Sequence, residues 1–153
     1  MSVLEVFTAL EKSWLGQGIQ SSLYIFPIIE VFHLLGLAVM GGAVLLVNLR
    51  LMGWGLKGFT VQKLSADVRP FQNGSLAVLL VSGFLLFASE PVKCYYHKTF
   101  WFKMASLAAA IAFSYTWQKK LIASGANHGK FTAIVSMILW SCVGIGGRLI
   151  GFE

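Results

Sequence analysis

The sequence predicts an all-α integral membrane protein, a four-helix bundle preceded by an N-terminal amphipathic helix at the membrane interface. The chain of 153 residues is 57% hydrophobic and only 12% charged, with a mean hydropathy of +0.75. It is thus far more apolar than an average soluble domain. Its four apolar runs are each long enough, at about 1.5 Å per residue, to cross a hydrocarbon core of roughly 30 Å. No internal repeat is visible, so we treat residues 1–153 as a single transmembrane domain.

The amphipathic helix is predicted at residues 3–15. Apolar side chains recur there at helical spacing, while charged side chains lie elsewhere around the wheel, which is typical of a helix lying in the interface plane. Gly16 and Gly18 are expected to end it. The apolar positions are Val3, Val6, Phe7, Leu10 and Trp14.

The four spans are predicted at residues 22–51, 72–89, 99–118 and 130–150. The first apolar run is too long for a signal peptide, so we expect it to be retained as a helix. Pro27 lies near the start of that span, where its missing N–H costs least. The first two spans are separated by a polar connection, Lys57 to Asn73, and the next two by a short loop rich in aromatic residues, EPVKCYYHK.

The net charge of +6 does not indicate nucleic-acid binding, because the basic residues lie in short clusters between apolar runs. In that position they set the orientation of a membrane protein. The side of the membrane that holds the first and third connections carries seven basic residues: Arg50, Lys57, Lys63, Arg69, Lys119, Lys120 and Lys130. The opposite side carries five: Lys12, Lys93, Lys98, Lys103 and Arg148. This bias predicts that both termini lie outside the cytoplasm.

The first span holds two ionisable residues, Glu30 and His33, on one helical face. An ionisable side chain in hydrocarbon costs about 2.5 kcal/mol or more, so such a residue marks a functional site with a partner to be found. Imidazole is the usual protein ligand of haem iron, and helical bundles hold cofactors between facing helices. Gly36 and Gly41 leave room beside the imidazole for a flat macrocycle. We therefore predict a haem b with His33 as its axial ligand.

Cations at the same depth support this prediction. Lys103 lies one turn into the third span and Arg148 one turn before the end of the fourth, where they can neutralise the haem propionates. His97 is the candidate second axial ligand, although it sits in the loop between spans. A deprotonated Lys103 as ligand and five-coordinate iron are the other options.

Other interpretations stay open for the same residues. His33 can be a buried histidine satisfied by Glu30 or by a serine, or a proton relay in a transporter. Small residues that recur along each span also serve close helix packing. Lys103 can extend its amine to the headgroups, and His97 can be a solvated loop residue.

Three segments resemble a bacterial family of small four-helix membrane proteins of unassigned function: SSLYIFPIIEVFHLLGLAVMGGAVLLVNLRLMG, FWFKMASLAAAIAF and SMILWSCVGIGGRLIGF. The resemblance covers roughly residues 20–152. More distantly, the chain is similar to the D-type copper-resistance membrane protein and to the small haem-binding protoporphyrinogen oxidase of bacteria. Their first-helix His and third-helix Lys match His33 and Lys103, which in the oxidase group are tied to haem binding. The family's Asp-Leu-Arg-Leu appears here as Asn48 to Leu51, and Ser114-Tyr115-Thr116 replaces a Tyr-His pair of the oxidase.

These observations lead us to expect a membrane b-type cytochrome of the bacterial inner membrane that binds haem in the outer half of the bundle. We expect it to pass electrons, between a membrane quinone and an exported redox protein, in the manner of a haem-dependent oxidoreductase. Two alternatives from other classes are a permease-like protein for copper or another small solute, and a structural subunit of a larger membrane complex.

Overall fold

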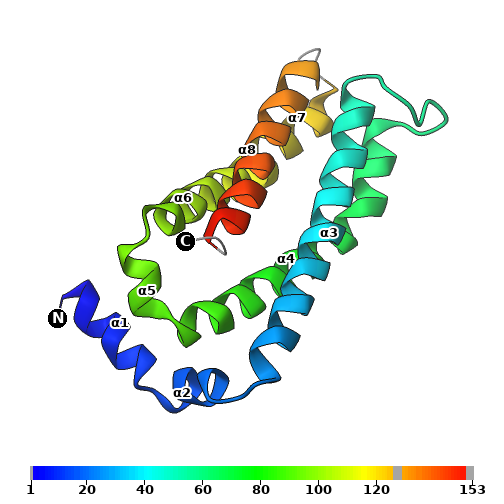
Figure 1. The fold of residues 1–153 in the computed structure, drawn as a ribbon. Coiled ribbons are helices and arrows are strands. Elements are labelled where there is room, and N and C mark those ends of the chain that lie inside the picture. The colour runs from blue at the N-terminus through cyan, green and yellow to red at the C-terminus, as the bar shows by residue number, and fades with distance from the viewer. Residues whose placement is uncertain (1, 126–128, 151–153) are drawn as a thin grey trace.

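A computed structural model describes residues 2–125 and 129–150, and every regular element within these residues is a helix (Figure 1). Three of the helices, α3, α4 and α8, are long and apolar enough to cross a membrane. Large apolar side chains of α3 such as Phe32 and Leu35 are 57% exposed, as suits contact with lipid. The elements are α1 (Val3–Glu11), α2 (Trp14–Gln20), α3 (Ile25–Leu51), α4 (Val61–Ser89), α5 (Pro91–Tyr96), α6 (Lys98–Ala112), the π-helix η1 (Phe113–Gln118), α7 (Lys119–Ser124) and α8 (Gly129–Ile150).

The N-terminal segment forms two helices rather than the single helix predicted at residues 3–15. The Ser2 hydroxyl accepts the Glu5 N–H, and the Glu5 carboxylate accepts the Ser2 N–H, so a capping box starts α1. Ser13 breaks the segment, because its side chain accepts the Gly16 N–H and starts α2. Gly16 and Gly18 therefore lie inside α2 and do not end a helix.

Gly16 marks a close approach between α2 and the end of α4. It is buried, and a Cβ built on it would lie 2.7 Å from the carbonyl oxygen of Ala88. A backbone atom cannot move aside as the end of a flexible side chain can. Only glycine therefore fits here without displacing α2 from α4.

We expect Gly16→Ala to lower the melting temperature and to speed tryptic cleavage after Lys12, because the added methyl group pushes α2 off α4. Gly18→Ala is the matched control, since a Cβ there meets nothing within 4 Å. Alanine is favoured over glycine in a helix by up to about 1 kcal/mol, so this control should be neutral or stabilising. Equal melting temperatures for the two variants would contradict the close packing.

The second long helix begins well before the predicted start at residue 72. Thr60 caps α4 by accepting the Lys63 N–H at 3.2 Å, so the stretch predicted as a polar connection is largely helical. Leu64 and Val68 on this stretch join a buried apolar cluster, which stabilises the early turns. Pro70 lies inside the helix at the loss of one backbone hydrogen bond.

The third long segment is continuous from α6 through η1 to α7, but a π-helical turn interrupts it. Sequence periodicity predicted an uninterrupted span at residues 99–118. The 15 residues of α6 extend only about 22 Å, which is shorter than a hydrocarbon core. A crossing by this segment therefore has to extend beyond α6 into η1.

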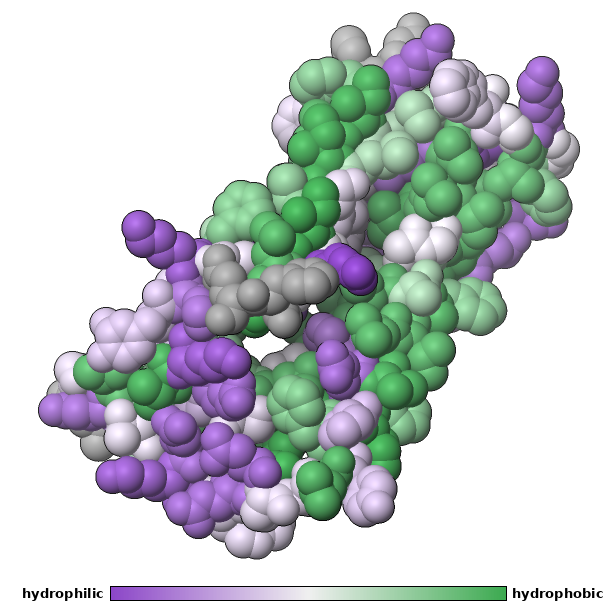
Figure 2. Space-filling model, in the orientation of Figure 1, coloured by the Kyte–Doolittle hydropathy of each residue, from purple (hydrophilic) through white to green (hydrophobic). Residues whose placement is uncertain are grey.

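The long helices form two arms, α3 with α4 and α6 with α8, which come together toward α7 (Figure 1). Two apolar clusters join them: Met40, Val44, Leu79, Ala110, Trp140 and Val143 in the middle, and Ala43, Val47, Leu64, Val68 and Ile122 near α7. No residue of α3 before Gly36, and none of α6 before Ala110, is fully buried. Openings between the arms are visible in the space-filling view, bordered by hydrophilic side chains (Figure 2). Among the described residues, α3 and α6 are therefore packed less tightly in the half of the molecule that carries His33.

Candidate functional site

His33 lies between α3 and α4, where a serine holds its ring. Its Nδ1 is 2.8 Å from the Ser82 hydroxyl, which is itself 2.5 Å from the carbonyl oxygen of Val78. A hydroxyl has one proton, so if Ser82 donates it to the carbonyl, it accepts the Nδ1–H of the imidazole. The other ring nitrogen, Nε2, then carries a lone pair that can bind a metal. Gly83 completes the slot, since a Cβ on it would lie 3.2 Å from the ring.

Lys103 is a half-buried cation near this imidazole. It crosses the two glycines of α8: a Cβ on Gly147 would lie 3.4 Å from the Lys103 amine, and one on Gly146 would lie 3.3 Å from its Cβ. The amine is close enough to His33 for its charge to act on the ring. Among the residues that the structure describes, it forms no ion pair. The structure therefore supplies an uncompensated positive charge at the depth of the imidazole.

Glu30, Gly36 and Gly41 do not surround the imidazole as the sequence interpretation assumed. Glu30 is exposed, and its carboxylate forms no hydrogen bond or ion pair with any residue in 2–125 or 129–150. A Cβ on Gly36 would lie 3.2 Å from Val78, so this glycine allows α3 and α4 to pack closely. Gly41 is exposed, with nothing within 4 Å of its Cβ position.

Arg148 and His97 both lie toward the His33 end of the molecule. Arg148 is exposed in the last turn of α8, and His97 is half-buried between α5 and α6, at the N-cap position of α6 but without a side-chain capping hydrogen bond. Both take part in interactions within the protein. His128, which the sequence places at the opposite end, is outside the described residues.

Cys94 is a poor alternative ligand. Burial, followed by the negative charge of Glu90, raises the pKa of the Cys94 thiol above its usual value. A thiol binds metal as the thiolate, so a raised pKa disfavours coordination at neutral pH. Within the described ranges, no three His, Cys, Asp or Glu side chains gather into a metal site.

A buried ring of amides and a hydroxyl links three helices, and the sequence analysis did not find it. The Asn48 amide donates to Ser136 at 3.1 Å, Ser136 donates to Gln118 at 3.4 Å, and the Gln118 amide donates to Asn48 at 2.8 Å. These side chains are 0%, 1% and 7% exposed, respectively. Asn48 lies in the first predicted span and Gln118 at the end of the third, and sequence spacing does not pair side chains on different spans. The ring connects α3, η1 and α8.

Comparison with known proteins identifies the family of the chain without assigning its chemistry. No match was found among the curated proteins. None was found among the solved structures. The chain belongs to DUF6644, a family of unknown function, which it matches over residues 6–153.

Proposed function

We propose that this protein is a membrane b-type cytochrome that binds one haem between its two arms, with His33 as axial ligand. One observation carries the proposal: the imidazole is held through Nδ1 by Ser82, which leaves Nε2 available where α3 before Gly36 and α6 before Ala110 bury no residue fully. Bound haem would supply reversible one-electron chemistry at its iron. The transfer of electrons within the membrane is the function that this arrangement supports best.

The surrounding residues suit this cofactor. A hydrogen bond to the second ring nitrogen selects the tautomer and orients a metal-binding histidine, which is the role proposed for Ser82. Lys103 supplies a positive charge for a propionate. In the proposed membrane arrangement, the segment from α6 through η1 to α7 crosses the membrane together with α3, α4 and α8, which completes a four-helix bundle. The helices α1 and α2 lie at the interface in this arrangement.

A site for haem is favoured over a site for a bare copper ion. Copper carried by a permease-like protein would need several protein ligands, and no group of three His, Cys, Asp or Glu side chains occurs in the part of the chain that the structure describes. Haem brings four nitrogen ligands of its own, so one imidazole is enough to hold it. His97 remains the proposed second axial ligand.

The test is a visible spectrum of protein purified from haem-replete cells. We expect a Soret band and, after dithionite reduction, the α band of protohaem. A pyridine haemochrome assay should give about one haem per chain if the single imidazole is the site. Colourless protein of full-length mass would refute the proposed function.

Lys103→Gln is expected to weaken haem retention and to lower the midpoint potential. Removing a nearby cation favours the more positive, oxidised iron, and a charge-assisted hydrogen bond is worth about 1.5–3 kcal/mol. Lys103→Arg, which keeps the charge, is the control, and potentiometric titration is the measurement. The proposed role of Lys103 fails if both variants keep the wild-type potential and occupancy.

We further propose that the protein lies in the bacterial inner membrane with both termini outside the cytoplasm. A quinone and an exported redox protein, or a larger membrane complex, would then be its electron-transfer partners. The support is the seven-to-five bias of Lys and Arg between the two sides. An alkaline phosphatase fused after the last residue should be active. Activity of a cytoplasmic reporter at that position would invert the topology.

A further inference from the structure

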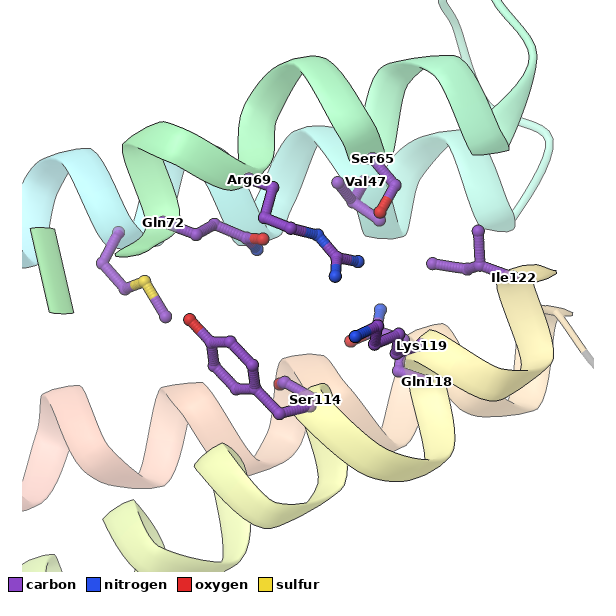
Figure 3. Close-up of a pocket in the computed structure, with 10 residues that line it drawn as sticks. Val47, Ser65, Arg69, Gln72, Ser114, Gln118, Lys119 and Ile122 are labelled. Carbon is purple, nitrogen blue, oxygen red and sulfur yellow. The ribbon is translucent and has the colours of Figure 1, made fainter. Parts of the chain in front are cut away.

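A polar pocket lies away from His33, between α4 on one side and η1 with α7 on the other (Figure 3). Ser65, Arg69 and Gln72 line it from α4, and Gln118 and Lys119 line it from the other side. No carboxylate is among its lining residues. Its enclosed volume is about 20 Å³, which is room for roughly one oxygen-sized group.

Several hydrogen-bond donors in this pocket have no protein acceptor. Ser65 is only 5% exposed, yet its hydroxyl makes no hydrogen bond to any described residue. The Arg69 guanidinium has no ion pair in the same part of the chain, and its charge bears on the neighbouring Tyr115. Figure 3 shows Arg69 and Lys119 extending into the space from opposite sides. Buried polar groups are normally paired, so the unpaired Ser65 hydroxyl indicates an acceptor within the pocket, beside the half-buried Arg69 and the exposed Lys119.

The remaining polar groups of the pocket are already engaged. The Gln118 amide donates to Asn48, and the Tyr115 hydroxyl donates to Asn73 at 2.6 Å. The structure gives no side-chain hydrogen bond to a described residue for four lining residues: Ser65, Arg69, Gln72 and Lys119. Two of these side chains, Arg69 and Lys119, are cations, and no carboxylate lines the pocket to pair with them.

We infer that this pocket binds the phosphate group of an anionic ligand. The planar fork of Arg69 matches two phosphate oxygens, while Lys119 is a second, mobile point charge. One oxygen fills the enclosed volume and accepts the Ser65 hydroxyl, and the others lie at the mouth between the two cations. The phosphate can belong to a lipid headgroup, since basic pockets between membrane helices bind such groups, or to free phosphate. This site is independent of the proposed haem.

The experiment measures binding of two probes to the full chain in detergent. Phosphatidylglycerol is titrated and read by native mass spectrometry, and inorganic phosphate is titrated by calorimetry. We expect Arg69→Gln to weaken binding by about tenfold or more, and Ser65→Ala by about fivefold. Lys63→Gln is the matched control, because Lys63 is an exposed cation on the same helix that does not line the pocket.

The outcomes separate the two sources of phosphate. If Arg69→Gln weakens binding of phosphatidylglycerol but not of inorganic phosphate, the site is for a lipid headgroup. If it weakens binding of inorganic phosphate but not of the lipid, the site is for the free ion. Failure of wild-type protein to bind either probe overturns the inference, as does an equal loss in Lys63→Gln. If Arg69→Gln melts below the wild type, Arg69→Lys and Ser65→Ala decide, and unchanged binding in both overturns the inference.

Discussion

Protein purified with His33→Ala is expected to lack haem while keeping its fold. The structure orients the imidazole through the 2.8 Å contact of its Nδ1 with Ser82, which leaves Nε2 available. Its ring lies against Gly83, so truncation opens a space large enough for a free imidazole molecule. Addition of imidazole to the growth medium or to the purified protein should therefore restore part of the Soret absorbance.

Leu34→Ala is the matched control for this prediction, because the neighbouring Leu34 side chain is 56% exposed and faces away from the site. It should leave the haem content unchanged. Ser82→Ala is expected to have an intermediate effect, about 10-fold to 100-fold weaker haem binding, as is usual for loss of a partner that orients a ligand. Wild-type haem content in His33→Ala would show that another residue is the ligand, and His97→Ala would then be the next variant to measure.

Asn48→Ala is expected to destabilise the fold by about 1–3 kcal/mol. The substitution removes the acceptor of the Gln118 amide and the donor to Ser136, and it leaves both partners buried without replacement. Interhelical hydrogen bonds in membranes contribute about 0.6 kcal/mol on average, but here two are lost at once and a cavity is added. Unfolding in mixed micelles followed by circular dichroism measures the change.

Asn73→Ala provides the comparison, because Asn73 accepts the Tyr115 hydroxyl at 2.6 Å but is exposed. Its loss should cost less than about 1 kcal/mol, since water or headgroups can replace it. If Asn48→Ala is no more destabilising than Asn73→Ala, the buried ring does not hold α3, η1 and α8 together. Because both variants keep His33, we expect folded protein of each to bind as much haem as the wild type, even where the buried ring is lost.

The sequence predicted the helical class and the apolar helices well, because hydropathy and length determine them. It did not predict the start of α4, since Lys63, Asp67 and Pro70 make the stretch read as a connection. Only the packing of its apolar face against α3 and α7 makes it helical. It also missed the division between α1 and α2, although Ser13 at the break is a good N-cap residue.

The candidate site was predicted in part. Depth counting placed Lys103 near His33, and the structure brings the two into electrostatic range. Of the two partners left open for the imidazole, Glu30 or a serine, the structure shows Ser82, because side-chain pairing across helices depends on their rotation. The π-helical turn was not predictable from periodicity. It rotates the residues that follow it in the segment to other faces of the helix than an uninterrupted α-helix would give them.

The uneven filling of the two arms has a consequence for the order of assembly. Both apolar clusters and the ring of Asn48, Gln118 and Ser136 lie beyond the level of Gly36, toward α7. Contacts that decide the relative positions of the four long segments are therefore complete without the His33 end. A large flat molecule can enter sideways between the arms after the chain has folded, without breaking either cluster. Insertion of the chain into the bilayer and binding of the proposed haem can thus be separate events.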